Sequence, residues 1–431
     1  MRVLAYTSPA KGHLFPVLPT LAELRRRGHH VALCTLAGEV ERAGALGLAA
    51  RPMAPAIEAR EIDDWRATSP LGAAKRALTT WLDRAPHEVE DLRAAIATVR
   101  PDVLLVDVNA WGAVSAAEAS GLPFAIFSPY FADFDIPGRP PFGLGLAPRS
   151  GLLGALRDRI LRFVSGLAFR PLLARLNALR RDLGVAPLSR VGDIALRGHR
   201  LLYFTADAFE YDHGGWPDSV RFVGAGLWEP PAPAEAPRPT RPLALITCST
   251  EFQDDGRLVE MALEALAGED LDVVATTGAI DPASFRAPQN ARIVRYAPHS
   301  ALLPHAAVVV CHGGMGITQK ALAAGVPVCA VPFGRDQNDV ARHLEAHGVG
   351  TSVPARALTA GRLREAIREA RKLTGAAARM AAAFARAAGP EGAAVELEAL
   401  AGVATDRARG TADPPDAVVP THSPGGHAPP F

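Results

Sequence analysis

The segment from Val308 to Gly350 constrains the fold of this chain more than any other. It begins with an apolar run that ends at Cys311, passes through a turn with three glycines, and enters a helix near Ile317. A second apolar run then leads into a polar loop. A strand, a tight turn, a helix and a second strand in this order are typical of a βαβ unit. The segment therefore predicts an α/β fold with a parallel sheet.

The glycine-rich turn of this unit is suited to an anion. Its backbone N–H groups can approach a ligand closely, and the following helix N-terminus carries about half a positive charge. His312 ends the first strand, at the edge where open α/β sheets bind ligands. Asp336 and Gln337, in the later loop, form a carboxylate–amide pair suited to sugar hydroxyls. A sugar nucleotide is the predicted ligand. The glycines of the turn are Gly313, Gly314 and Gly316.

The same segment resembles the donor-binding signature of family 1 glycosyltransferases, which are inverting, nucleotide-sugar-dependent enzymes with the two-domain GT-B fold. That signature runs from a His through two small residues and a Ser or Thr to Ala-Leu-x-x-Gly-Val-Pro and an acidic residue followed by Gln. The matching residues are His312, Gly313, Gly314, Thr318, Ala321, Leu322, Gly325, Val326, Pro327, Asp336 and Gln337. The weaker resemblance over about residues 1–400 is to bacterial natural-product and macrolide glycosyltransferases.

The alternation of strands and helices predicts two Rossmann-like domains whose parallel sheets face one another across a cleft, which is the GT-B arrangement. A proline-rich segment between them excludes a helix or a central strand and is predicted to be a linker. The last residues carry few large apolar side chains and are predicted to be disordered. The predicted segments are an acceptor-binding domain (1–227), a linker (228–242), a nucleotide-sugar domain (243–384), a helix that the resemblance returns to the N-terminal domain (385–403) and a tail (404–431).

The individual elements follow from the same pattern. Strands are predicted at 2–7, 30–35, 102–107, 123–127, 201–205, 243–248, 271–276, 292–295, 308–311 and 326–331. Helices are predicted at about 14–27, 110–120, 154–183, 256–267, 360–372 and 375–401.

Composition limits the partners and the compartment. With 46 Lys+Arg against 45 Asp+Glu, the chain has no bulk attraction for nucleic acid or acidic membranes. The short apolar run at the N-terminus predicts a strand and not a signal peptide, and no apolar run is long enough for a transmembrane helix. We expect a cytoplasmic protein with buried free thiols. The cysteines are Cys34, Cys248, Cys311 and Cys329.

His13 is the leading candidate for a catalytic base. It stands in the loop after the first predicted strand, and a neutral imidazole can remove a proton from an attacking hydroxyl at cellular pH. The family carries its base in a similar Gly-His-x-x-Pro element, matched here by Gly12, His13 and Pro16. Asp107 ends another predicted strand where the family has an Asp, so the resemblance implies a His13–Asp107 dyad. A packing histidine and a helix-capping aspartate are the alternatives.

Other donor contacts are implied by the resemblance. Two residues match the family's Gly-Ser/Thr element beneath the phosphates, with a serine in place of the glycine, and three match its aromatic-x-Pro-Gln/His element beside the pyrimidine. These residues are Ser249, Thr250, Tyr296, Pro298 and His299. Thr318, on the first turn of the helix, either donates to a phosphate oxygen or caps that helix.

Lys320 departs from the family pattern. Many members have a Glu there that accepts hydrogen bonds from ribose hydroxyls, whereas an ammonium has no acceptor lone pair. Either Lys320 reaches a phosphate, or the donor carries a deoxyribose, so UDP-sugars and dTDP-sugars both stay open. No carboxylate cluster suggests Mg²⁺, and the helix terminus with His312 can balance a leaving diphosphate. We therefore expect no metal and no cofactor beyond the nucleotide-sugar co-substrate.

The acceptor side is indicated by aromatic residues in two predicted loops, 61–83 and 128–150. Aromatic side chains on mobile loops suit a lipophilic acceptor, although each of them can instead pack beneath the N-terminal sheet. The candidates are Trp65, Trp81, Tyr130, Phe131, Phe134 and Phe142.

The helix predicted at 154–183 carries an apolar stripe on one face and many arginines on the other. We expect this stripe to be buried against the domain, with docking on an anionic membrane as the alternative. The stripe consists of Leu156, Ile160, Phe163, Val164 and Leu167.

These features predict an inverting hexosyltransferase. It would move a sugar from a UDP- or dTDP-sugar to a hydroxyl of a lipophilic small molecule in a single displacement. The alternatives are a nucleotide-sugar isomerase or epimerase on the same fold, and a non-catalytic sugar-nucleotide-binding partner protein. The presence of both His13 and Asp107 speaks against the second of these.

Overall fold

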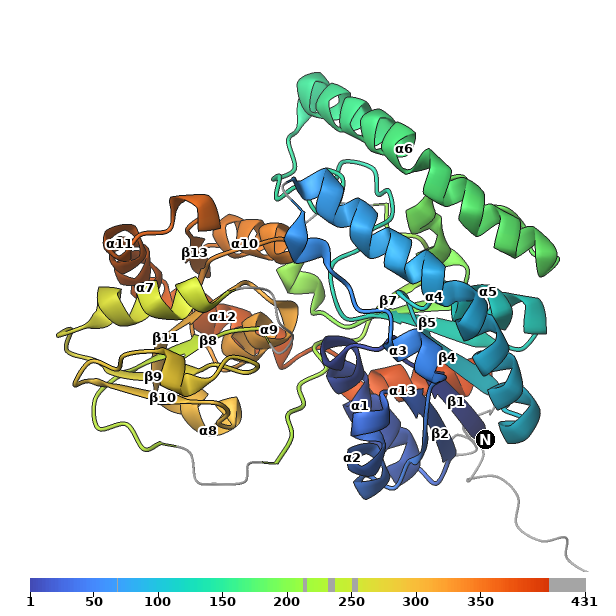
Figure 1. The fold of residues 1–431 in the computed structure, drawn as a ribbon, viewed down its shortest axis with the longest axis horizontal. Helices are drawn as coiled ribbons and strands as arrows, with labels where there is room; N and C mark the ends of the chain where they lie inside the picture. Colours follow the sequence, from blue (N-terminus) through green and yellow to red (C-terminus); the bar gives the residue numbers. More distant parts are fainter. Residues whose placement is uncertain (68, 212–214, 232–236, 250–254, 403–431) are drawn as a thin grey trace, which may run out of the picture.

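A computed structural model describes residues 1–67, 69–211, 215–231, 237–249 and 255–402. The chain forms two α/β halves, each built on its own sheet, as Figure 1 shows. The predicted fold class is therefore confirmed. Two predictions fall on residues outside these ranges, namely the donor contact at Thr250 and the tail at 404–431.

The N-terminal half contains a seven-stranded sheet with the order β3-β2-β1-β4-β5-β6-β7, in which all neighbouring strands are parallel. Its strands are β1 (Arg2–Tyr6), β2 (His30–Thr35), β3 (Ala49–Pro52), β4 (Val103–Asp107), β5 (Phe124–Ser128), β6 (Arg200–Tyr203) and β7 (Val220–Phe222). Its helices are α1 (Lys11–Arg26), α2 (Val40–Ala45), α3 (Pro55–Glu58), α4 (Pro70–Val99), α5 (Trp111–Ser120) and α6 (Gly151–Asp182). The central strands are apolar on both faces because helices cover both.

The C-terminal half contains a six-stranded parallel sheet with the order β10-β9-β8-β11-β12-β13. Its strands are β8 (Leu243–Thr247), β9 (Asp272–Thr276), β10 (Ala291–Val294), β11 (Ala306–Cys311), β12 (Val328–Ala330) and β13 (Gly350–Ser352). The helices that follow in sequence are α7 (Gly256–Leu266), α8 (His299–Leu302), α9 (Met315–Ala323), α10 (Gln337–Ala346), α11 (Ala360–Arg371), α12 (Thr374–Phe384) and α13 (Gly389–Leu400). All four cysteines are buried and free.

The helix predicted at 375–401 is in fact two helices. The chain leaves α12 after Phe384 and re-enters a helix at Gly389, whose φ of 62° is left-handed. Pro390 follows at once and cannot extend the preceding helix because it lacks an N–H group. The break turns α13 back onto α1 of the N-terminal half, where Glu398 pairs with Arg27 at 3.0 Å and with His29 at 2.7 Å.

Two predictions about the N-terminal half are wrong. Much of the predicted loop 61–83 belongs to the long helix α4, whose N-cap Ser69 accepts a hydrogen bond from the Gly72 N–H at 3.2 Å, so Trp81 lies on a helix. The stripe on α6 is not buried: its residues are exposed, although α6 lies on α4, as Figure 1 shows. An amphipathic pattern identifies an apolar face but not what covers it.

The two halves meet in a buried cluster around His343 of α10. Its Nε2 atom lies 2.8 Å from a carboxylate oxygen of Glu210, which also pairs with Arg139. Phe131 stacks on the same imidazole, with ring centroids 3.7 Å apart. These contacts join the N-terminal half to the C-terminal half.

Candidate active site

The carboxyl ends of two neighbouring strands bring the predicted dyad together. Because β1 and β4 are paired in parallel, the segment that follows β1 and the residue that ends β4 lie at the same edge of the sheet. Nδ1 of His13, on the first turn of α1, is 2.9 Å from one oxygen of Asp107 and 3.0 Å from the other. The two side chains therefore form the close pair that the sequence suggested.

Asp107 is held as a carboxylate. Burial by itself favours its protonated form, yet the adjacent His13 ring and backbone N–H groups hold the pKa of Asp107 below its ordinary value. One oxygen accepts from the Ser8 N–H at 2.9 Å and from its hydroxyl at 3.0 Å, and the other accepts from the Asn109 N–H at 2.9 Å. An ionised acceptor of this kind favours the His13 tautomer with its proton on Nδ1.

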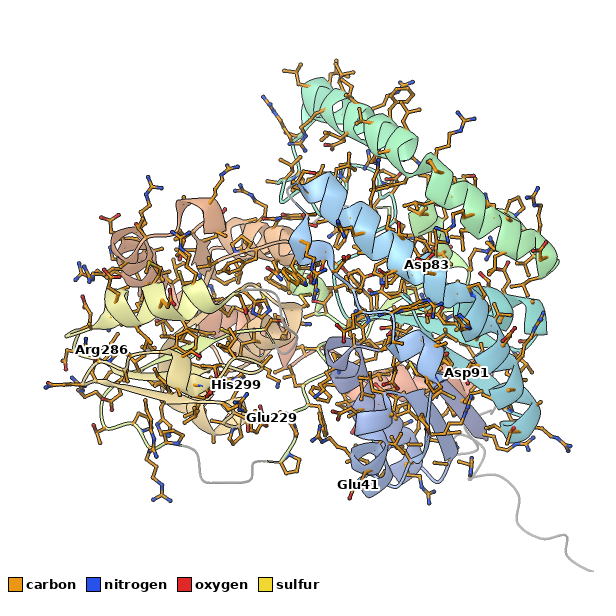
Figure 2. All side chains as sticks on the ribbon, viewed as in Figure 1. Glu41, Asp83, Asp91, Glu229, Arg286 and His299 are labelled. Carbon is orange, nitrogen blue, oxygen red and sulfur yellow. The ribbon has the colours of Figure 1, made fainter. Side chains whose placement is uncertain are left out.

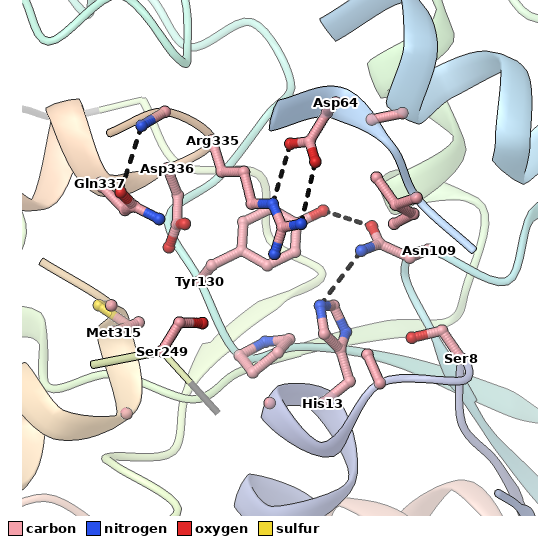
Figure 3. A pocket seen from close by; sticks show the side chains of 18 of the residues that line it. Ser8, His13, Asp64, Asn109, Tyr130, Ser249, Met315, Arg335, Asp336 and Gln337 are labelled. Carbon is pink, nitrogen blue, oxygen red and sulfur yellow. Dashed lines mark hydrogen bonds and ion pairs between the residues drawn. The ribbon is translucent and has the colours of Figure 1, made fainter. Parts of the chain in front are cut away.

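Asn109, which the sequence did not single out, occupies the other imidazole nitrogen. Its amide Nδ2 lies 3.2 Å from Nε2 of His13, and its carbonyl accepts from the Tyr130 hydroxyl at 2.7 Å, as Figure 3 shows. An amide NH₂ only donates, so the Nε2 atom that it faces carries a lone pair. The imidazole is thus set up as a base whose Nε2 lone pair accepts from the Asn109 amide at the wall of the cavity.

The glycine-rich turn after β11 has the geometry of an anion site. Gly313 has a φ of 85°, and a Cβ on Gly314 would lie 2.2 Å from Nε2 of His312, so both positions need glycine. The helix α9 begins at Met315, two residues earlier than predicted, which places Gly316 in its first turn. The first N–H groups of α9 therefore open toward the cavity that His312, Met315 and Gly316 line.

His312 and Thr318 bring further polar groups to this turn. Burial, with Arg335 nearby, lowers the pKa of His312 to about 4, so its imidazole is neutral at neutral pH. Nδ1 of His312 and the hydroxyl of Thr318 are buried and make no hydrogen bond of normal geometry with any described residue. Buried polar atoms of this kind are typical of a site that takes a ligand.

The remaining predicted donor residues lie around the same turn. Ser249 follows β8, beside β11, and its N–H donates to Asp255 at 2.7 Å. Asp336 and Gln337 follow β12 and line the cavity, but the Gln337 side-chain carbonyl already accepts from the Phe333 N–H at 2.8 Å. Figure 3 shows this pair and His13 at different sides of one pocket.

The carboxyl group of Asp336 destabilises the folded chain when it is ionised. Burial raises the pKa of its carboxyl from 3.8 to about 6. The folded chain therefore binds an extra proton between these pH values, and ionising Asp336 destabilises it as the pH rises through that window.

Asp336→Asn is accordingly expected to raise the free energy of unfolding at pH 8 by up to about 3 kcal/mol, and to leave it unchanged near pH 3. Urea denaturation without nucleotide at both pH values measures this. The exposed Asp182→Asn is the control and should change neither value. Equal effects of Asp336→Asn at the two pH values would contradict a raised pKa of Asp336 in the folded chain.

Lys320 pairs with a carboxylate from the linker. Its ammonium lies 3.3 Å from Glu229, which also accepts from the backbone N–H groups of His299 at 3.0 Å and Ser300 at 2.9 Å. Figure 2 shows Glu229 beside His299. Burial opposes its charge, yet these donors and Lys320 hold the pKa of Glu229 below its ordinary value. Glu229 and Lys320 both line the cavity, as does Tyr296.

The acceptor candidates lie at the N-terminal side of a cavity of about 1290 Å³. Five of the six line it, whereas Phe131 lies between the two halves on His343 and does not. The lining residues are Trp65, Trp81, Tyr130, Phe134 and Phe142. Phe169 and Leu173 of α6 add to this wall and were not predicted. Pro298 is the N-cap of α8 and does not line the cavity.

Arg335 links the two walls of the cavity. Its guanidinium makes two contacts of 2.9 Å with the carboxylate of Asp64, which precedes Trp65 (Figure 3). A two-point contact of this kind fixes the relative orientation of both groups. It therefore ties the loop that carries Asp336 to the loop that carries Trp65.

Comparisons with known proteins agree with this geometry. Residues 260–400 match the protein family described as the erythromycin biosynthesis protein CIII-like C-terminal domain. The 4'-demethylrebeccamycin synthase of Lentzea aerocolonigenes is 33% identical over 392 residues, which span 85% of this chain and 91% of that protein.

Solved structures share the whole fold. A glycotransferase of kitacinnamycin has a TM-score of 0.75 and 24% identity, covering 93% of this chain and 98% of its own. The glycosyltransferase VinC in complex with DTDP has a TM-score of 0.66 and 22% identity, covering 94% and 100%. At these identities the similarity shows the fold.

Proposed function

The chain belongs to the natural-product glycosyltransferases of the GT-B fold, and from this premise we propose that it transfers a hexose from a nucleoside-diphosphate donor to a hydroxyl of a lipophilic small molecule, with inversion. The observation that carries the proposal is that His13, held between Asp107 and Asn109, lines the same cavity as the glycine-rich donor turn. The isomerase and the non-catalytic alternatives are not favoured, because similar proteins include named glycosyltransferases.

The reaction follows from the dyad. The acceptor hydroxyl replaces the Asn109 amide at Nε2 of His13 and gives its proton to that nitrogen as its oxygen attacks the anomeric carbon. The bond from that carbon to the diphosphate oxygen breaks, and the diphosphate leaves with the electron pair. Asp107 stabilises the imidazolium formed on His13, in the manner of a catalytic triad. One displacement inverts the anomeric carbon.

The leaving diphosphate is held without a metal ion in this proposal. The first N–H groups of α9 and the neutral His312 imidazole donate to it, and the helix terminus adds partial positive charge. Such donors stabilise charge that develops as the sugar–oxygen bond breaks. Asp336 and the amide nitrogen of Gln337 take up hydroxyls of the donor sugar.

Glu229 completes the nucleoside site. Its carboxylate, which comes from the linker, takes the place of the Glu that many family members have at the position of Lys320. Lys320 favours the ionised form of that carboxylate. One carboxylate whose oxygens already accept three hydrogen bonds suits the single ring hydroxyl of a deoxyribose better than a ribose diol. The similarity in fold to a protein solved with DTDP supports the same choice. The proposed donor is therefore a dTDP-sugar.

Calorimetric titration in the presence of EDTA tests the donor. TDP is expected to bind about tenfold more tightly than UDP, because UDP lacks the thymine methyl group and buries an extra hydroxyl. Glu229→Gln should weaken TDP about 10- to 100-fold, since it replaces a charged acceptor, while its remaining carbonyl can still accept from the α8 N–H groups.

The matched control is Glu264→Gln, an exposed position on α7 of the same domain, which should leave TDP affinity unchanged. Binding that requires added Mg²⁺ would contradict the metal-free site. Equal affinity for UDP and TDP would overturn the choice of a dTDP-sugar, and full TDP affinity in Glu229→Gln would restrict Glu229 to capping α8.

A further inference from the structure

The helix α6 presents a continuous apolar face to solvent. Its apolar side chains recur every three or four residues, so they lie along one side of the helix. Leu152 is 89% exposed, Leu153 69% and Phe163 64%. The other exposed members are Leu156, Ile160, Val164 and Leu167. These residues, named here the α6 stripe, form a contiguous apolar surface of the kind that marks an interaction site.

The charges along the stripe are all positive. Arg159 and Arg170 are exposed beside it, and the acidic residue on this stretch, Asp158, is buried and paired with Arg157 at 2.8 Å. Residues Gly151–Arg175, all of which are described, thus expose arginines but no carboxylate. An apolar stripe flanked by cations complements an anionic, apolar surface.

The opposite face of the same helix belongs to the cleft. Ser165, Gly166, Phe169 and Leu173 point to the cavity that also holds His13 and Trp65. The helix therefore separates the aromatic side of the cavity from the α6 stripe, at the outer edge of the N-terminal half (Figure 1).

We propose that the α6 stripe docks on the surface of an anionic lipid membrane, with its apolar side chains at the level of the acyl chains and Arg159 and Arg170 at the lipid phosphates. Docking places the aromatic wall of the cavity next to the bilayer, where lipophilic molecules concentrate. The helix lies on the membrane and does not cross it, since no described helix is long and apolar enough to span one. A second copy of the chain fits less well, because Arg159 and Arg170 of both copies would meet, while α6 itself exposes no carboxylate between Gly151 and Arg175 to pair with them.

Vesicle flotation with the purified full chain tests the docking. The protein is expected to float with vesicles of phosphatidylcholine and phosphatidylglycerol, to bind at least tenfold more weakly to phosphatidylcholine alone, and to be released as the salt concentration rises. The double variant Ile160→Ser/Phe163→Ser should lower the partition coefficient at least tenfold, and Arg159→Glu/Arg170→Glu should remove the preference for the anionic lipid.

Matched controls are Val395→Ser, an exposed apolar position on α13, and Arg286→Glu/Arg379→Glu, two exposed arginines of the C-terminal half. Both should bind vesicles as the unmodified chain does. Absence of flotation would overturn the proposal, and so would a concentration-dependent dimer in light scattering that Ile160→Ser/Phe163→Ser dissociates. Flotation is measured without donor or acceptor, so its result does not depend on whether sugar transfer is demonstrated.

Discussion

Replacement of His13 by Ala is expected to lower kcat for sugar transfer by about 10²- to 10⁴-fold and to leave the Kd for TDP within a few-fold. The Nε2 atom of His13 faces Asn109 at the N-terminal wall, whereas the donor turn belongs to the C-terminal half. Loss of the imidazole should therefore remove the base without removing a donor contact. Steady-state kinetics with a phenolic or aliphatic alcohol acceptor, together with calorimetry with TDP, measures both quantities.

His30→Ala is the matched control, because His30 is an exposed histidine at the start of β2. It should leave both kcat and Kd unchanged. If His13→Ala lowered the affinity for TDP by the same factor as kcat, His13 would be a donor ligand. A variant with full kcat would show that another group removes the acceptor proton.

Asp107→Asn is expected to lower kcat by about 10³- to 10⁴-fold, the scale seen when the aspartate of a catalytic triad is replaced by asparagine. The two carboxylate oxygens of Asp107 accept from His13, Ser8 and Asn109. An amide has one acceptor oxygen, so its NH₂ group would face one of these donors. The variant would therefore disturb the orientation of the imidazole and could not stabilise an imidazolium.

A double variant tests whether His13 and Asp107 act together. If they act as one unit, kcat of His13→Ala/Asp107→Asn should be about as low as kcat of His13→Ala alone.

The control for stability is Asp91→Asn, which removes another buried carboxylate, one that accepts from Tyr6 at 3.0 Å. It should lower the melting temperature without lowering kcat of the folded enzyme. Multiplicative losses in the double variant would contradict a dyad.

The order of apolar strands and helices in the sequence predicted the parallel sheets. Because parallel strands present their carboxyl ends at one edge, it also placed His13, Asp107, His312 and Asp336 where functional residues gather. The need for glycine at Gly313 and Gly314 arises from the conformation of the turn itself. The glycine-rich turn was therefore recognisable in the sequence. Short-range periodicity and turn chemistry are properties of neighbouring residues, so a sequence suffices to detect them.

Other features depend on residues that are distant in the chain. The sequence showed that Lys320 could not accept a hydrogen bond, but only the folded chain brings Glu229, 91 residues away, to within 3.3 Å of it. Asn109 stands two residues after Asp107, yet the turn after β4 decides that its amide faces Nε2 of His13.

The helix α6 is a second case in which the sequence could not predict a tertiary contact. Its sequence pattern determined that one face is apolar, and we expected that face to be buried. Whether an apolar face is buried depends on which surface packs against the helix, and α6 meets α4 and the cleft with its other side. The sequence by itself thus determined the elements and the chemistry at their ends. Tertiary packing alone decided which distant side chains meet and which apolar face stays exposed, because both depend on contacts that no local pattern encodes.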